Sequence, residues 1–108
     1  MFNTEQAFDA LGDATRRRVF KRLQNGACSV GEIAKGMDVS RPAVSQHLRV
    51  LKDAGLVVVR PIGTRRLYGI ETRGIEAMRT WLDGFWDGAL VAFKAAAERE
   101  ATKGRKRR

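Results

Sequence analysis

The chain has 108 residues, the length of a single domain, and a formal net charge of +9 from 21 basic and 12 acidic residues. This surplus of positive charge favours a polyanionic partner, either a nucleic acid or an anionic membrane surface. One cysteine excludes an intrachain disulfide. Because there is no charged-then-apolar leader and no apolar run of membrane-spanning length, we expect a cytoplasmic protein without a membrane partner.

The first two expected helices have clear boundary signals. The first spans residues 4–12, with Thr4 as its cap and Gly12 as its stop. The second is capped by Asp13 and runs to Gln24. Its outer face carries five basic residues, which we interpret as a solvated face with local ion pairs rather than as phosphate contacts: Arg16, Arg17, Arg18, Lys21 and Arg22.

The next two helices are short and are joined by a tight link. Ser29 and Glu32 form a capping box that opens a helix to about residue 37. After the link 38–40, Ser40 caps a helix that Gly55 ends, at a position where a left-handed residue is wanted. A cationic, well-capped second helix after such a turn predicts a helix-turn-helix.

The helix 40–54 has two different faces. Val44, Leu48 and Leu51 recur at helical spacing and predict a buried stripe. The other face is donor-rich, with no acidic residue before Asp53, and consists of Arg41, Ser45, Gln46, Arg49 and Lys52, with Pro42 in the first turn. Such side chains suit the major groove of DNA, since Arg pairs with guanine and Gln with adenine. The competing interpretation is an ordinary solvated face.

A β-hairpin follows, because the apolar period changes from 3.6 to 2 after Gly55. Strands are expected at residues 56–60 and 65–70, with turn residues at 61–64. Three arginines gather near the turn end: Arg60, Arg65 and Arg66. We interpret them as contacts to the DNA backbone or minor groove rather than as charges that prevent edge pairing. The predicted fold is therefore mainly α with a small β-hairpin, a winged helix-turn-helix whose wing spans 56–70.

Thr72 is the expected cap of the last helix, which runs from about residue 73 to 100. This helix is apolar on more than one face, which requires a second partner. We predict a two-fold homodimer. Its interface residues are expected to be Phe8, Met78, Leu82, Phe85, Trp86, Ala89 and Phe93. Gly84 and Gly88 either permit close helix approach or weaken the helix. Residues 1–101 would thus form the DNA-binding and dimerisation domain, and the basic residues 102–108 a disordered tail.

Several separated segments resemble the ArsR family of bacterial winged-helix regulators. They are residues 10–17, 29–34, 40–51, 54–57 and 63–68, in the order that the family has them. The resemblance covers roughly residues 5–95 and implies a dimeric cytoplasmic repressor that binds operator DNA and releases it when an effector binds. It does not identify the effector.

The sequence departs from the metal-sensing members of that family. The positions that match their cysteines hold Ser29 and Gly31, and the neighbouring Cys28 is a single thiol. The only histidine, His47, falls at the edge of a buried face, where we expect a structural residue. The last helix offers acidic residues without a nitrogen ligand: Glu76, Asp83, Asp87 and Glu98. We therefore expect no metal and no cofactor, as in the metal-independent branch.

The preferred functional hypothesis is a sequence-specific repressor on an inverted-repeat operator. Four residues would read base edges, namely Arg41, Ser45, Gln46 and Arg49, and four would hold phosphates or the minor groove, namely Lys52, Arg60, Arg65 and Arg66. The alternatives are a nonspecific basic architectural protein, a protein-interaction scaffold, and a redox-sensing regulator that uses Cys28, although a small apolar filler is the preferred role of this thiol. An enzyme is not expected, because no catalytic constellation can be assembled from one histidine and one cysteine.

Overall fold

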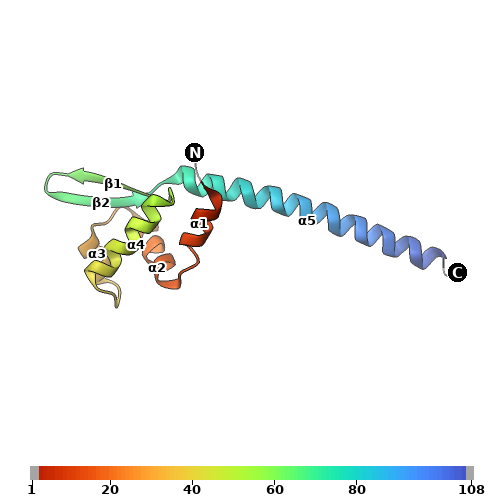
Figure 1. Ribbon diagram of the computed structural model, residues 1–108, viewed down its shortest axis with the longest axis horizontal. Coiled ribbons are helices and arrows are strands. Elements are labelled where there is room, and N and C mark those ends of the chain that lie inside the picture. Colours follow the sequence, from red (N-terminus) through yellow and green to blue (C-terminus); the bar gives the residue numbers. More distant parts are fainter. Residues whose placement is uncertain (1–2, 107–108) are drawn as a thin grey trace. The chain divides into compact units, whose positions relative to one another are not determined.

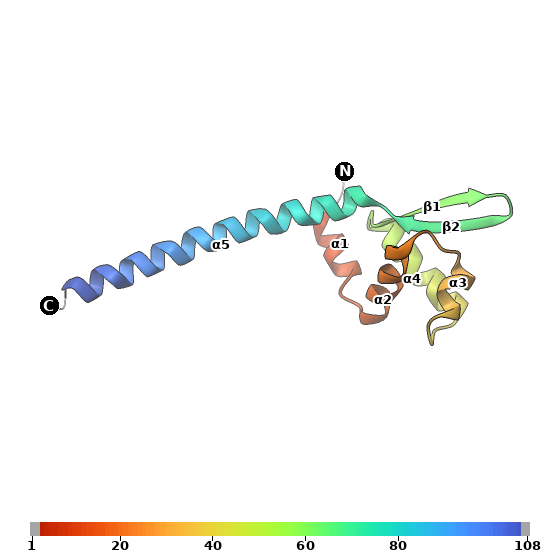
Figure 2. The same ribbon diagram turned by 180° about the vertical axis from the view of Figure 1, so that it is seen from behind.

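The computed structural model describes residues 3–106 and divides into two units, residues 3–78 and residues 79–106. We call the first the winged-helix unit and the second the α5 extension, and each is described by itself. The elements are α1 (Thr4–Ala10), α2 (Ala14–Arg22), a 3-10 turn (Leu23–Asn25), α3 (Val30–Lys35), α4 (Arg41–Asp53), β1 (Val57–Ile62), β2 (Arg65–Ile70) and α5 (Thr72–Lys106) (Figures 1 and 2). This order confirms the predicted winged helix-turn-helix fold.

The core of the winged-helix unit is built around one face of α4. Val44, Leu48 and Leu51 are completely buried, which confirms the predicted stripe. They belong to one cluster with residues from α2, α3 and the start of the hairpin: Val19, Ile33 and Leu56. Because α4 gives its apolar side to this cluster, its polar side faces outward.

Helix starts follow the predicted caps at three of five sites. Asp13 accepts from the backbone N–H of Arg16, and Ser40 accepts from that of Ala43. Ser29 and Glu32 form both bonds of the capping box.

The caps of the first and last helices were predicted one residue too late. Asn3, not Thr4, caps α1, through Oδ1 and the N–H of Gln6 (3.1 Å). Thr72 is the first residue of α5, and the Glu71 carboxylate accepts from the N–H of the following turn (3.2 Å). Asn caps at least as well as Thr, so α1 starts at the earlier acceptor. At α5 the Glu71 carboxylate takes this place and also accepts from Nε of the Arg73 side chain (3.2 Å).

The end of α4 is held by a Schellman motif. Gly55 has φ +78°, as predicted, and its N–H donates to the Lys52 carbonyl (3.0 Å). The Leu56 N–H donates to the Leu51 carbonyl (2.9 Å). The two bonds satisfy carbonyls at the end of the helix and turn the chain directly into β1.

The hairpin is longer than predicted. Strand β1 continues through Pro61 and Ile62, so the turn consists only of Gly63, at φ +63°, and Thr64. Proline is tolerated because both strands of a two-stranded ribbon are edges. Cys28 adds a short bridge to β2, since its backbone exchanges two hydrogen bonds with Tyr68 (3.0 and 2.8 Å).

The basic face of α2 also contacts the end of α1, which the sequence did not predict. Arg16 and Arg17 donate to the carbonyls of Ala10 and Leu11 (3.1 and 2.8 Å), so two of the five cations hold the C-terminal end of α1 instead of forming ion pairs. Cations at the last carbonyls of a helix also match its dipole.

In the α5 extension the helix continues to Lys106, beyond the predicted end near residue 100. The structure thus gives residues 102–106 as helical where the sequence indicated a disordered tail, and residues 107 and 108 lie outside the described part. The Thr102 hydroxyl donates to the Glu98 carbonyl (3.0 Å), and Lys and Arg are good helix formers. No helix within residues 3–106 is both long and apolar enough to cross a membrane.

Candidate nucleic-acid interface

The outward face of α4 presents the polar residues predicted from the sequence. Every one of them is exposed: Arg41, Pro42, Ser45, Gln46, Arg49 and Lys52. His47 is half-buried beside this face, as expected. Because the opposite side of α4 is packed into the core, the backbone that carries these exposed side chains is held in place.

Two hollows lie between α4 and the hairpin, and together we call them the recognition groove. The first, of about 380 Å³, is lined by Ser45, Arg49, Lys52, Asp53, Val59, Arg66 and Tyr68. The second, of about 520 Å³, is lined by Ser29, Val30, Gly31, Arg41, Ser45, Thr64, Arg65, Arg66 and Tyr68. The two share three residues, so the groove is continuous along α4. It brings together six of the nine predicted DNA-binding residues.

Arg41 is positioned by the helix that precedes it. A Cβ built on Gly31 would lie 3.0 Å from Nη2 of Arg41, so the guanidinium rests directly over this glycine of α3. Gly31 therefore leaves the space in which Arg41 lies along the groove.

Arg65 has a partner that the sequence did not indicate. Its guanidinium forms an ion pair with the Glu32 carboxylate, which links the wing to the first turn of α3. Hydrogen bonding by Ser29 and the nearby charge of Arg65 hold the pKa of Glu32 below its usual value. Arg65 is thus partly neutralised, and this solvent-exposed pair connects the tip of the wing to the helix-turn-helix.

Three predicted residues do not line the recognition groove. Pro42 and Gln46 are exposed on α4 outside it. Arg60 lies on the other side of the hairpin, where it lines a separate hollow with Val58 and Ile62. Side chains alternate between the faces of a strand, so Arg60 and Arg66 cannot share a face in this register, which pairs Arg60 with Leu67 and Pro61 with Arg66.

Tyr68 is the groove residue that sequence reasoning missed. It is half-buried, packs against the core and lines both hollows. The available signal was its spacing of two from Arg66 on β2, which places both on one face.

Comparisons with known proteins place this geometry in a family. A helix-turn-helix domain matches residues 11–60. The chain is 50% identical over 96 residues to the HTH-type transcriptional regulator Rv2034 of Mycobacterium tuberculosis, covering 89% of this chain and 90% of that protein. It is 31% identical to the transcriptional repressor SdpR of Bacillus subtilis, covering 72% of this chain and 87% of SdpR.

Solved structures of transcriptional regulators resemble this chain as well. An ArsR-like transcriptional regulator from Rhodococcus sp. RHA1 superposes with a TM-score of 0.75 at 29% identity, covering 87% of this chain and 92% of that one. The chain belongs to the ArsR family of winged helix-turn-helix transcriptional regulators. A second neighbour is the homodimeric winged helix-turn-helix DNA-binding domain Mb0332 of Mycobacterium bovis, described as a possible ArsR-family regulator. It has a TM-score of 0.63 at 26% identity over 77% of each chain.

This ArsR-family chain is therefore a regulator rather than an enzyme, as predicted, since the relatives are named as transcriptional regulators. Within residues 3–106 no three His, Cys, Asp or Glu side chains are grouped as ligands for a metal ion. Cys28 is buried; its thiol donates to the Gly26 carbonyl (3.4 Å) and lies 3.6 Å from a guanidinium nitrogen of Arg22. The thiol is thus enclosed by its own loop and helix α2.

The residues predicted for the dimer interface of this regulator fall into two groups. Met78 packs against the core of the winged-helix unit, and Phe8 on α1 is half-buried. The rest are exposed on the α5 extension: Leu82, Phe85, Trp86, Ala89 and Phe93. Phe85 and Phe93 are 63% and 73% exposed, and the ring of Phe85 stacks on that of Trp81 (5.6 Å between centroids).

Proposed function

We propose that the chain is a sequence-specific DNA-binding repressor that inserts α4 into the major groove. The observation that carries the proposal is the recognition groove, a continuous cationic surface formed by the exposed face of α4 and one face of the wing. Base edges would be read by Arg41, Ser45, Gln46 and Arg49. Phosphates or the minor groove would be held by Lys52, Arg60, Arg65 and Arg66.

We propose a homodimer that buries the α5 extension. Large apolar side chains at this exposure need a partner, and Leu82, Phe85 and Trp86 recur on one side of the helix. The homodimeric state of Mb0332 supports a dimer for this chain as well. The two copies of α4 would lie about 34–36 Å apart, so the operator would be an inverted repeat.

The proposal includes repression in the cytoplasm without a family-type metal site. SdpR, a relative of similar length, is named as a repressor. The positions that would match the family's cysteine ligands hold Ser29 and Gly31, and Ser29 is already used as a helix cap. Two hard hydroxyl or backbone groups do not replace soft thiolates.

Single substitutions on α4 test base reading. We expect Arg49→Ala and Gln46→Ala each to cost about 1–3 kcal/mol on operator DNA and to relax the preference for particular bases. Fluorescence anisotropy on operator and scrambled duplexes measures both effects. Arg18→Ala, an exposed arginine of α2 outside the groove, is the matched control and should leave the specificity ratio unchanged.

Two results separate the proposal from its alternatives. A purely electrostatic architectural protein loses affinity with salt equally on all sequences, whereas a repressor keeps a gap of about a thousandfold or more. Equal losses on operator and scrambled DNA for both α4 variants would show that neither residue reads bases. If the Cys28→Ala protein responds to oxidant as the native chain does, a redox role of this thiol is excluded.

A further inference from the structure

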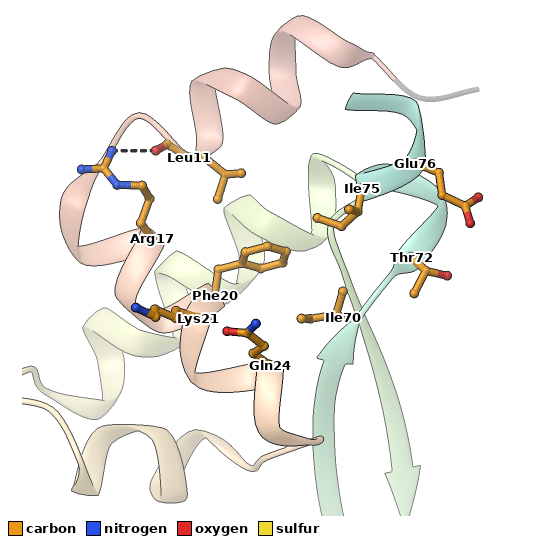
Figure 3. A pocket seen from close by; sticks show the side chains of 9 residues that line it. All are labelled: Leu11, Arg17, Phe20, Lys21, Gln24, Ile70, Thr72, Ile75 and Glu76. Atoms are coloured by element: carbon orange, nitrogen blue, oxygen red, sulfur yellow. Dashed lines mark hydrogen bonds between the residues drawn. The ribbon is translucent and has the colours of Figure 1, made fainter. Parts of the chain in front are cut away.

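A hollow of about 680 Å³ opens in the winged-helix unit where α2, the end of β2 and the first turns of α5 meet. It shares no residue with the recognition groove. Figure 3 shows four apolar side chains converging on its central space: Leu11, Phe20, Ile70 and Ile75. The volume lies in the range of small-molecule sites, about 300–1,000 Å³.

Charge at the edge of this hollow is uneven. Lys21 and Arg17 lie along α2 on one side, and the Lys21 ammonium points outward from the apolar side chains in Figure 3. Arg17 uses Nη1 for the Leu11 carbonyl (2.8 Å), which leaves its other guanidinium donors. Within residues 3–106 the Lys21 ammonium forms no side-chain hydrogen bond and no ion pair, whereas the Lys21 carbonyl accepts from the Leu23 N–H. Glu76, the one acidic lining residue, comes from α5 on the other side, and its carboxylate points away from the central space (Figure 3).

Apolar walls and a cationic edge select one ligand chemistry. An alkyl or aryl body would cover the apolar wall, including Ile75, which is 36% exposed. An anionic head at the edge would pair with the Lys21 ammonium after this exposed side chain turns inward, with further donors from Arg17 and the Gln24 amide. A cationic amphiphile would bring its charge close to Lys21 and Arg17, and a fully polar anion would leave the apolar side chains exposed to water.

We propose that this hollow is a binding site for a small amphipathic carboxylate. The site is separate from the DNA-binding surface, so its test needs no DNA and stands whether or not the proposed function holds. Most of its lining comes from three elements, α2, β2 and α5, and Leu11 after α1 and Gln24 of the 3-10 turn complete it. Along the chain α2 precedes the helix-turn-helix, and the start of α5 continues into the α5 extension.

The four isoleucines of the full chain can report ligand binding at the hollow and away from it. Ile70 and Ile75 line the hollow, Ile33 is completely buried in the core, and Ile62 is exposed at the wing tip. With isoleucine δ1-methyl labelling, titration with sodium octanoate should shift the methyl signals of Ile70 and Ile75 saturably. Ile33 and Ile62 should stay in place. The neutral analogue 1-octanol should shift the same two signals at about tenfold weaker affinity.

A charge variant tests the head-group contact. Lys21→Gln should weaken octanoate several-fold and leave 1-octanol unchanged. Lys35→Gln, the same change at an exposed lysine of α3 outside the hollow, should alter neither.

Three results would overturn the proposal. The first is no saturable shift of Ile70 and Ile75. The second is an equal shift of Ile62, which would mean general adsorption. The third is an equal effect of Lys21→Gln and Lys35→Gln on octanoate affinity, which would show that Lys21 does not bind an anionic head group. If the Ile70 and Ile75 signals respond to protein dilution but not to octanoate, a second copy of the chain covers the hollow instead.

Discussion

Replacing Gly74 by alanine should destabilise the winged-helix unit strongly. Gly74 is buried in the first turn of α5, and a Cβ there would overlap the Gly55 carbonyl oxygen and lie 3.2 Å from Cδ2 of Leu56. The obstacle is backbone held by the Schellman motif, so the clash is expected near the upper end of overpacking costs, about 3 kcal/mol. Alanine returns about 1 kcal/mol of helix propensity, which leaves a net loss of about 2 kcal/mol.

The same substitution elsewhere in α5 is the control. Gly84 has no atom within 4 Å of a built Cβ, so Gly84→Ala should gain up to about 1 kcal/mol. In thermal unfolding followed by circular dichroism at one protein concentration, we expect the melting temperature of Gly74→Ala to fall by about 8–16 °C. The Gly84→Ala protein should melt slightly higher than the native chain.

Opposite signs for the two variants are the essential result. Unchanged stability of Gly74→Ala would refute the close approach of α5 to the end of α4. A loss of stability in Gly84→Ala would instead show that a partner helix packs on that glycine, which is one of the two roles considered for Gly84 and Gly88.

Three further predictions concern stability and assembly. Because the pKa of Glu32 is lowered in the folded state, its carboxylate stabilises the fold above pH 4.5, and this contribution is lost as the pH falls through the lowered pKa. The free energy of urea unfolding of Glu32→Gln should therefore depend less on pH in this acidic range than that of the native chain. Parallel curves of stability against pH for the two proteins would contradict this. Ser40→Ala should cost about 1 kcal/mol in urea unfolding by removing the α4 cap, whereas Ser40→Asp should cost little, and equal losses would argue against capping. Phe85→Asp should convert the proposed dimer to monomer in analytical ultracentrifugation, while Val91→Asp, the control, should stay dimeric because position 91 lies on another side of α5; two dimeric variants would exclude the predicted interface.

Local signals accounted for most of the fold. The Ser29 capping box, the Ser40 cap and the Gly55 stop each depend on residues within one helical turn, and all three are present. The Val44 stripe was equally clear, because helical period and burial point to the same face. The missed caps at Asn3 and Glu71 are errors of one residue between adjacent acceptors, which sequence spacing resolves poorly.

The recognition groove was predictable only in part, since it depends on tertiary pairing. The cations of α4 follow from one helix, but the ion pair of Glu32 with Arg65 joins residues 33 positions apart and requires the hairpin to fold back on α3. Alternation along each strand predicts which residues of that strand share a face. Only the register of the two strands shows that Arg60 and Arg66 lie on opposite faces of the hairpin. The hollow beside Phe20 depends on three elements meeting and had no sequence signal.

The most direct test of the central claim is the affinity of the purified native chain for an operator found by genome-wide footprinting, compared with a scrambled duplex at the same salt concentration. Our account predicts a specificity gap of about a thousandfold or more on an inverted repeat, bound by two copies of the chain. Equal affinity for both duplexes, or binding by one copy to a single half-site without loss, would contradict it.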